Sequence, residues 1–366
     1  KGNFGGHYMN NMRALIGMSG GVDSSVAALL MKQSGYECIG ATMRLYANPT
    51  EVSPCCSLED VEDARSVACK LNMPYYVFNF SDEFRCQVMD RFADAYEQGR
   101  TPNPCIDCNR YLKFGTMLRR AQELGCDYVV TGHYARIRRD AQTGRYLLYK
   151  AADIQKDQTY FLYPLTQQML AHTLFPLGEL TKPQVREIAR LQGFVTARKH
   201  DSQDICFVPD GDYPAFMERY TGKTYPQGNY LDQSGAIVGR HQGAVRYTIG
   251  QRKGLNLALG EPVYVCSKDM AANTVTVGPN SALFSSALRA GDWNWFPFDS
   301  LRSPQSCTAK IRHSQTETPA RVYPEETGFA RVEFESPLRA VTPGQAVVLY
   351  QGDLVLGGGT ITEALK

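Results

Sequence analysis

Three cysteines of this 366-residue chain lie in segments whose neighbours are suited to chemistry. Cys105 and Cys108 form a C-x-x-C pair within "TPNPCIDCNRYLKF" (101–114), and Cys206 follows an acidic, polar loop in "KHDSQDICFVP" (199–209). The pair has three candidate uses: half of a zinc site, a redox couple, or a nucleophile that reacts with a substrate. For Cys206 taken alone, core packing is the default interpretation, because buried cysteines behave as small hydrophobic residues.

The spacing of the cysteines disfavours zinc and a thioredoxin-like couple. Structural zinc needs four ligands; the pair supplies two, no second C-x-x-C or histidine pair lies at finger spacing, and Cys55 and Cys56 are adjacent. Two prolines before the pair favour an extended approach rather than a compact redox domain. A helical pattern follows Cys108, so we expect this thiol at a helix N-terminus, where its pKa would be lowered.

The stretch "GMSGGVDSS" (17–25) predicts a phosphate-binding turn between a strand and a helix. Its adjacent glycines let the backbone approach a ligand, its serines offer hydroxyl donors, and the helix start offers unpaired N–H groups. The ending of a Walker loop is absent. Asp23 is out of place beside an anion unless it holds Mg²⁺ or caps the helix. The whole S-G-G-x-D-S-S pattern resembles the pyrophosphate loop of ATP pyrophosphatases, which adenylate carbonyl oxygens.

The surrounding pattern predicts the elements that position these residues. Short apolar runs alternate with helical runs from 13 to about 200, which predicts a parallel α/β sheet with ligands at the carboxyl ends of its strands. Around 210 the sequence becomes rich in glycine and turn residues. From about 280 onward, β-type runs separated by Pro, Gly and Asn predict a small β-barrel.

The bulk composition excludes several classes of protein. Hydrophobic residues make up 43% and charged residues 21% of the chain, as in ordinary globular proteins. No apolar run of about 18 residues is present, and 1–11 has no signal core, so we expect neither a membrane span nor secretion. The eleven irregularly spaced cysteines favour a reducing cytoplasm. With a net charge of only +2, a polyanion partner must be held by local patches.

Eight segments, in chain order, resemble the family of bacterial tRNA-specific 2-thiouridylases. They are "GMSGGVDSSV", "TPNPCIDCN", "TGHYAR", "KDQTYFLY", "GELTKPQVREIA", "DSQDICF", "IGQRKGL" and "TPGQAVVLY". The family places sulfur on C2 of the wobble uridine (U34) in the tRNAs for lysine, glutamate and glutamine. The resemblance implies an extension or tag remnant at 1–11, a Rossmann-like ATP-pyrophosphatase domain at 12–211, a small central domain at 212–278, and a tRNA-binding C-terminal β-barrel at 279–366.

The resemblance also implies a mechanism. In the family's N-P-x-x-x-C-N pattern the cysteine before the asparagine is constant, which makes Cys108 the nucleophile, and the D-S-x-x-I-C-F motif makes Cys206 the persulfide carrier. The uridine C2 oxygen attacks the α phosphate of ATP and pyrophosphate leaves. A cysteine desulfurase or a sulfur-relay protein loads Cys206, whose sulfur attacks C2 directly or is released by Cys108. The second route ends in a Cys108–Cys206 disulfide, which a reducing cytoplasm restores.

Two sets of binding residues follow from the same resemblance. ATP with Mg²⁺ is expected at Gly17, Met18, Ser19, Gly20, Gly21, Val22, Asp23, Ser24, Met43 and Gly132. The target base, extruded from the anticodon loop, and the tRNA are expected at Asn103, Pro104, Cys105, His133, Lys156, Asp157, Gln158, Arg312, His313 and Gln345. By their residue types alone, His133 would be an ordinary turn histidine and the Arg312–His313 pair a solvated strand face.

Cys105 departs from the family, because many members carry Asp at this position. The departure removes a carboxylate near the base and places a third thiol beside Cys108 and Cys206. Three thiols with one open iron position are a ligand set for a [4Fe–4S] cluster, which we keep as an alternative cofactor.

Two other functions stay open. One is another pyrophosphatase-type enzyme that adenylates a small-molecule carbonyl or a different tRNA base, for which a reactive cysteine pair is unnecessary. The other is a non-catalytic tRNA-binding protein, for which the pyrophosphate loop is unnecessary.

Overall fold

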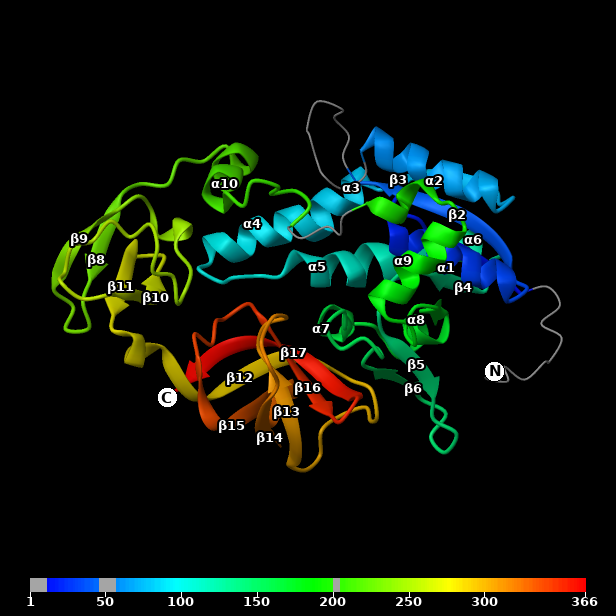
Figure 1. Ribbon diagram of the computed structural model, residues 1–366. Coiled ribbons are helices and arrows are strands. Elements are labelled where there is room, and N and C mark those ends of the chain that lie inside the picture. The colour runs from blue at the N-terminus through cyan, green and yellow to red at the C-terminus, as the bar shows by residue number, and fades with distance from the viewer. Residues whose placement is uncertain (1–11, 46–56, 200–204) are drawn as a thin grey trace. The chain divides into compact units, whose positions relative to one another are not determined.

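The computed structural model describes residues 12–45, 57–199 and 205–366 (Figure 1). Residues 1–11 lie outside these ranges. Cys55 and Cys56, which are neighbours in sequence, also lie outside them. The chain forms two compact units: unit 1 is Lys1–Gln87 with Cys105–Pro209, and unit 2 is Val88–Pro104 with Asp210–Lys366. Within the described ranges, no helix combines the length and the apolar character that crossing a bilayer requires.

Unit 1 is built on a parallel sheet, which confirms the fold class predicted from the alternating pattern. Its strand order is β3-β2-β1-β4-β7, so β1 lies at the centre. Every neighbouring pair in this sheet is parallel. The strands are β1 (Arg13–Gly17), β2 (Glu37–Arg44), β3 (Tyr75–Asn79), β4 (Tyr128–Val130) and β7 (Thr173–Leu174).

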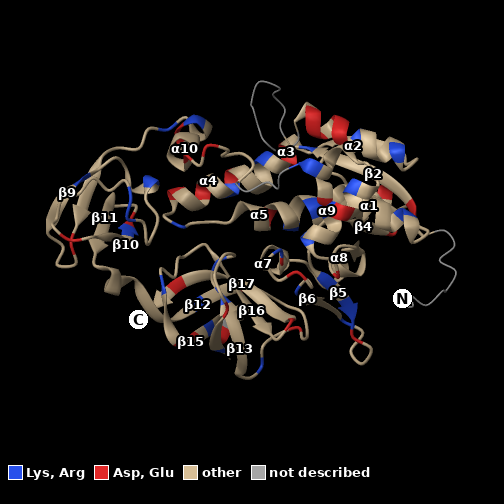
Figure 2. Ribbon diagram, in the orientation of Figure 1, with Lys and Arg blue, Asp and Glu red and all other residues tan. Residues whose placement is uncertain are grey.

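Helices and one hairpin complete unit 1. The antiparallel hairpin consists of β5 (Arg136–Arg139) and β6 (Tyr146–Tyr149), and β5 is conspicuously basic (Figure 2). The helices are α1 (Val22–Gln33), α2 (Leu58–Lys70), α3 (Ser81–Phe84), η2 (Cys108–Thr116), α6 (Met117–Glu123), α7 (Thr159–Leu162), α8 (Gln167–Ala171), α9 (Lys182–Leu191) and η3 (Val195–Arg198). Two short helices, η1 (Arg85–Met89) and α5 (Pro104–Asp107), span the boundaries with unit 2.

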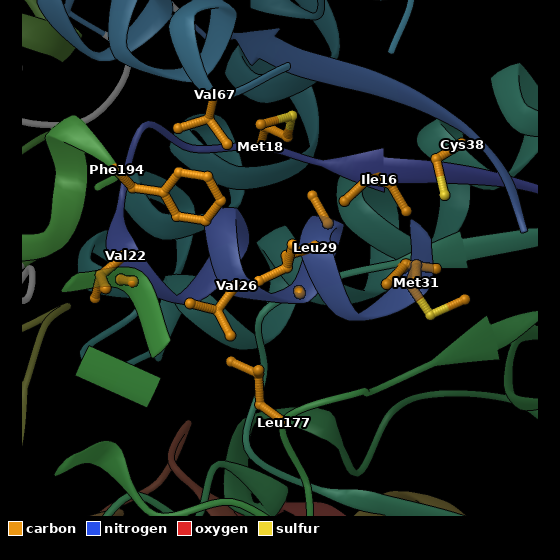
Figure 3. Close-up of a cluster of buried hydrophobic side chains, with 14 of the residues drawn as sticks. Ile16, Met18, Val22, Val26, Leu29, Met31, Cys38, Val67, Leu177 and Phe194 are labelled. Carbon is orange, nitrogen blue, oxygen red and sulfur yellow. The ribbon is translucent and has the colours of Figure 1, made fainter. Parts of the chain in front are cut away.

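The core of unit 1 lies between β1 and the helices that cover it. Ile16 and Met18, at the end of β1, are buried with Val26 of α1 (Figure 3). Phe194 and Leu177 from later segments complete the same cluster. Each large apolar side chain stabilises the fold by about 1.5–3 kcal/mol when fully buried, so the strand that leads into the predicted phosphate loop is held on both faces.

Unit 2 contains the β-barrel that the C-terminal sequence predicted. Its antiparallel strands follow the order β12-β15-β14-β13-β16-β17, and β17 pairs back onto β12, which closes the barrel. The strands are β12 (Phe284–Trp295), β13 (Gln305–Lys310), β14 (Thr318–Pro324), β15 (Ala330–Arg339), β16 (Ala346–Gln351) and β17 (Leu354–Leu365).

A second, smaller sheet and two helices form the rest of unit 2. The sheet has the order β10-β11-β8-β9, and short helical turns η4 (Ala244–Arg246), η5 (Asn280–Leu283) and η6 (Glu326–Gly328) follow separate strands of the unit. Phe92 of α4 packs on Phe216 of α10 with ring centroids 5.8 Å apart, and Asp90 accepts a hydrogen bond from the Tyr220 hydroxyl. The elements are α4 (Asp90–Glu97), α10 (Tyr213–Thr221), β8 (Gly228–Leu231), β9 (Ile237–His241), β10 (Tyr264–Asp269) and β11 (Thr274–Gly278).

Truncation of Ile16 is expected to destabilise unit 1. Ile16 is 0% exposed, so Ile16→Ala should lower the free energy of unfolding by about 2–5 kcal/mol, because lost burial and a new cavity add together. Denaturant unfolding measures the change. Leu191→Ala, at a side chain 68% exposed, is the control and should change stability by less than about 0.5 kcal/mol; equal losses in the two variants would contradict the assigned core.

Candidate active site

The predicted phosphate loop joins β1 to α1 and is ordered by its own serines. Ser24 and Ser25 are buried, and their hydroxyls donate to the Gly21 carbonyl at 3.1 and 2.9 Å. The Ser19 amide donates to Ser24 Oγ at 3.2 Å. Because Gly21 precedes the first turn of α1 without a side-chain cap, the first N–H groups of the helix remain available for an anion.

Gly20 fixes the loop against the start of α2. Its φ is +72°, a left-handed conformation that favours glycine. A Cβ at this position would lie 2.4 Å from the Asp60 carbonyl oxygen and 2.7 Å from the Asp60 Cα. Asp60 is itself held by a capping box with Ser57, so the backbone that meets Gly20 is not able to give way.

Gly132, predicted as an adenosine contact, approaches the same loop from the end of β4. A Cβ on Gly132 would lie 2.7 Å from the Asp23 carbonyl carbon and 2.8 Å from the Ser24 nitrogen. Met43 lies near the carboxyl end of β2, two residues beyond Ala41, which pairs with Gly17. The structure therefore places both residues at the edge of the sheet where the phosphate loop begins.

Asp23 does not cap the helix, which corrects one of the two uses proposed for it. Its carboxylate lies 2.8 and 2.7 Å from the Nζ of Lys182 and accepts a hydrogen bond from the Tyr134 hydroxyl at 2.8 Å. The Lys182 side chain is only 9% exposed and that of Asp23 is 31% exposed. A largely buried ion pair therefore stands beside the phosphate loop.

Cys108 is not at a helix N-terminus, contrary to the sequence-based expectation. Helix α5 begins at Pro104, and Cys108 opens the π-helical stretch η2 that continues it. Cys105 occupies the first turn instead. Because the effect of a helix N-terminus fades within the first turn, that effect does not reach Cys108. π-Helical segments are frequent at functional sites, and this one carries the predicted nucleophile.

Asn109 ties the start of η2 to α7. Its side chain is buried, and Nδ2 donates to the Phe161 carbonyl at 3.1 Å. Its Oδ1 is buried without a hydrogen-bond donor among the described residues. Leu112 and Phe114 are fully buried on the same helical stretch. These contacts fix the backbone that presents the half-buried Cys108.

The segment that carries Cys206 packs on the helix that also contacts η2. Phe207 meets Phe84 of α3 edge-on, with ring centroids 5.8 Å apart and an interplanar angle of 77°, and α3 contacts η2. Lys199 anchors the preceding chain to α2 through Asp60 and Asp63, each at 2.6 Å. Residues 200–204 lie outside the described ranges. Both cysteine segments therefore share α3 as a support.

The described residues do not offer a metal site. No group of three or more His, Cys, Asp or Glu side chains within the described ranges is arranged to hold a metal ion. Cys105 is exposed, whereas Cys108 and Cys206 are half-buried. Among the described residues, these cysteines therefore do not form a ready ligand set for an iron–sulfur cluster.

Among the predicted tRNA contacts in unit 1, Asp157 and Gln158 organise the chain around them. Asp157 is buried and accepts from the Ala151 amide at 3.0 Å and the Thr159 hydroxyl at 2.6 Å. Gln158 Oε1 accepts from the Tyr134 amide at 2.9 Å, and Lys156 is half-buried. These bonds link the "KDQ" segment to Tyr134, whose hydroxyl reaches the phosphate loop.

His133, one of the predicted tRNA contacts, is a buried histidine. Its Nδ1 lies 2.7 Å from the Thr131 hydroxyl, and its ring packs against Phe114 and Phe175, each at a centroid distance of 5.8 Å. Burial, with a smaller contribution from Lys113, holds the pKa of His133 well below its ordinary value. The imidazole is therefore neutral at physiological pH.

One of the predicted tRNA contacts in unit 2, Gln345, holds the segment that leads to the C-x-x-C motif. Gln345 Nε2 donates to the Thr101 carbonyl at 2.9 Å, two residues before Asn103. Arg312 Nη2 donates to the Arg339 carbonyl at 2.7 Å, and His313 is exposed. Pro104 is buried and Asn103 half-buried. Gln345 and Arg312 thus make structural hydrogen bonds in this unit.

Sequence reasoning missed Lys182, Tyr134 and Asn109. Lys182 lies in "GELTKPQVREIA" and Tyr134 in "TGHYAR". No sequence pattern predicts that these two residues contact Asp23, which is 159 positions from Lys182. For Asn109 a signal existed, because it follows Cys108 directly in the quoted motif.

A phosphate loop at the carboxyl edge of a parallel sheet defines an α/β nucleotide-binding protein, here with a β-barrel later in the chain. Three family descriptions match it: "tRNA methyl transferase HUP domain" at residues 12–210, "tRNA methyl transferase PRC-barrel domain" at 214–279 and "Aminomethyltransferase beta-barrel domain" at 285–361.

Curated proteins match over nearly the whole chain. A protein of Acetivibrio thermocellus named "tRNA-specific 2-thiouridylase MnmA" is 51% identical over 96% of this chain and 100% of its own length. Proteins of the same name from Symbiobacterium thermophilum and Clostridioides difficile are 52% and 48% identical, over 97% of this chain and 93% and 99% of their own lengths. The chain belongs to the tRNA-specific 2-thiouridylase family, as its motifs predicted.

The buried His133 should make stability depend on pH. Below about pH 6.5 the unfolded chain binds a proton that the folded chain does not, so the free energy of unfolding falls with decreasing pH by up to about 1.4 kcal/mol per unit. In His133→Gln this contribution is absent. Denaturant unfolding between pH 7.5 and 5 should therefore show a shallower loss in the variant; parallel curves would contradict the buried neutral imidazole.

Proposed function

We propose that this chain is an ATP-dependent tRNA-uridine 2-sulfurtransferase that thiolates C2 of the wobble uridine (U34) in the tRNAs for lysine, glutamate and glutamine. One arrangement carries the proposal: unit 1 holds both the ordered phosphate loop and the two cysteine segments that pack on α3. An enzyme that activates a carbonyl oxygen with ATP and then replaces it by sulfur needs both in one catalytic unit.

The phosphate loop serves the first half of the reaction. Attack of the uracil C2 oxygen on the α phosphorus forms a C–O–P bond and displaces pyrophosphate, so the oxygen later leaves as part of AMP. The loop amides and the hydroxyl of Ser19 bind and orient the triphosphate. Mg²⁺, when bound with ATP, supplies shielding of phosphate charge, and the carboxylate and hydroxyl oxygens around Asp23 are the donor type it prefers.

The two cysteines serve the second half. The terminal sulfur of a Cys206 persulfide attacks C2 and AMP leaves, which gives a mixed disulfide between the base and Cys206. The Cys108 thiolate then attacks the Cys206 sulfur, the S–S bond breaks, and 2-thiouridine is released. Alternatively, Cys108 attacks first and the released hydrosulfide attacks C2. Both routes leave a Cys108–Cys206 disulfide, which a thiol reductant must reduce.

Unit 2 offers a surface suited to RNA. A cavity of about 500 Å³ is lined by Arg246, Arg312 and Arg339 together with the rings of Tyr96 and Tyr213. Arginine guanidinium groups bind backbone phosphates, and tyrosine rings stack on bases. This combination favours a tRNA substrate over a small molecule.

The competing functions fit these features less well. A synthetase for a small molecule has no use for the paired cysteine segments. The family descriptions at 12–210 and 214–279 name a methyl transferase, but methyl transfer does not require adenylation of the substrate and leaves the phosphate loop unexplained. A non-catalytic tRNA-binding protein leaves both features unexplained.

The sulfur source and the compartment follow from the chemistry. We propose a cysteine desulfurase or a sulfur-relay protein as the donor, because sulfane sulfur on Cys206 is most directly supplied by another persulfide. A reducing cytoplasm fits this cycle, since the disulfide must be reduced in each turnover.

A direct assay tests the function. The protein is incubated with ATP, a persulfide donor and unmodified tRNA for lysine, and 2-thiouridine is detected by its retardation in a mercury-containing gel. Formation of 2-thiouridine that depends on ATP is expected. AMP release that requires a small molecule but no tRNA would instead favour the synthetase.

Serine substitutions separate the two halves of the reaction. Cys108→Ser and Cys206→Ser should each reduce 2-thiouridine formation to below about a thousandth of wild type, because a required nucleophile is lost. Both should still release pyrophosphate when ATP and tRNA are present. Cys69→Ser, at an exposed cysteine outside the predicted site, is the matched control and should retain activity; thiolation by either serine variant with a persulfide donor would exclude the assigned roles.

A further inference from the structure

We propose that Lys182 is a catalytic residue of the adenylation step, held on Asp23 until ATP binds. This inference deepens the proposed function and rests on it. When ATP binds, the Lys182 side chain would move its ammonium group from the Asp23 carboxylate to the triphosphate. There it would stabilise the negative charge that develops on the departing pyrophosphate.

The placement of Lys182 is unfavourable on structural grounds alone. It is the first residue of α9, whose N-terminus carries partial positive charge, and the first turn of α9 contains no acidic residue. A cation at this position is disfavoured by the helix dipole. Its side chain is also only 9% exposed, and burying a charged group costs free energy unless the charge is paired. A positive charge here therefore needs a strong compensating interaction or a function.

Asp23 provides the compensating interaction and connects it to the phosphate loop. Both carboxylate oxygens lie within 2.8 Å of Lys182 Nζ, and the ammonium also lies 5.9 Å from the centroid of the Tyr134 ring. Asp23 is in the first turn of α1, two residues after Gly21. The lysine tip is thus at the edge of the loop that receives the phosphates.

The neighbouring contacts hold this arrangement in place. Gly132 packs against the backbone of Asp23 so closely that a Cβ would clash. The Tyr134 hydroxyl donates to Asp23 Oδ1, and the backbone of Tyr134 is fixed through the side chain of Gln158. At the other end, the Lys182 amide donates to Asp153 Oδ2 at 2.9 Å. The backbones of Asp23, Tyr134 and Lys182 are therefore each held by a neighbouring contact.

The negative charge of the triphosphate would change the ion-pair partner of Lys182 when ATP binds. The triphosphate brings several negative charges close to Asp23, so the carboxylate and the phosphates compete for the same cation. Moving Nζ to the phosphates leaves the Asp23 oxygens for the metal that accompanies ATP. Removing a single donor that stabilises charge developing in the transition state typically slows a reaction by about 10²–10³-fold.

The test compares Lys182→Met and Lys182→Arg with a matched surface control, Lys70→Met. Lys70 is exposed, and its Nζ donates to the Gly193 carbonyl at 2.9 Å. Single-turnover release of pyrophosphate is measured with ATP, unmodified tRNA and no sulfur donor, together with ATP affinity, thermal stability and loading of Cys206 with persulfide.

We expect both Lys182 variants to release pyrophosphate more slowly, by about a hundredfold or more for Met and at least about tenfold for Arg, because a guanidinium does not reproduce a compact ammonium. Both Lys182 variants should load Cys206 with persulfide to the same extent as the wild type. The Lys70→Met variant should match the wild type in every measurement. Arg keeps the ion pair, so a purely structural pair predicts that Arg restores both stability and rate.

The experiment distinguishes failure of the role proposed for Lys182 from failure of the proposed function. A folded Arg variant that releases pyrophosphate within threefold of the wild-type rate would overturn the proposal, and so would a Met variant with that rate. If the wild type makes no 2-thiouridine but releases pyrophosphate with another substrate, the proposed function fails. The role of Lys182 is then decided by the same rates with that substrate.

Discussion

The close packing of the phosphate loop against its neighbours is the constraint on which the catalytic unit depends. Gly20 meets the backbone of Asp60 and Gly132 meets the backbone of Asp23, both at distances that exclude a side chain. Because protein interiors resist small changes in volume, the loop cannot move without displacing α2 or the end of β4. The loop is therefore shaped before a phosphate arrives, and binding need not order it.

The contacts that hold the phosphate loop also extend to the two cysteine segments. Asp60, whose backbone meets the phosphate loop, holds Lys199 at 2.6 Å, and the chain beyond Lys199 leads to Cys206. Phe207 then packs on Phe84 of α3, and α3 contacts the π-helical stretch that carries Cys108. One set of contacts thus positions the phosphate loop and the two cysteine segments.

Much of this fold could be predicted from sequence because its signals are local. The alternation around "RALIGMSGG" and the helix after it depend on neighbouring residues, and the structure has β1 and α1 at these positions. The π-helix could not be predicted in the same way, since the apolar spacing after Cys108 fits an α-helix as well. Only the structure shows the tight contact of this stretch, in which a Cβ on Gly115 would lie 3.0 Å from the Arg110 carbonyl oxygen, five residues earlier.

The Asp23–Lys182 pair could not be predicted because the two residues are distant in sequence. The position of each charge is unusual only in the folded protein. In sequence, Asp23 suggests a cap or a metal ligand and Lys182 suggests an ordinary basic helix residue. Only the fold shows that the carboxylate lies beside a phosphate loop and that the ammonium is buried at a helix N-terminus.

Charge compensation then explains why such a pair is stable without ATP. Removing one partner of a buried pair leaves an uncompensated charge, which costs several kcal/mol. Without ATP, each group therefore neutralises the other. In the proposed exchange, the triphosphate would replace the carboxylate as the counter-ion of Lys182, and the metal that accompanies ATP would compensate the carboxylate. A loop already fixed by Gly20 and Gly132 would need no rearrangement for this exchange, in which the lysine tip would move.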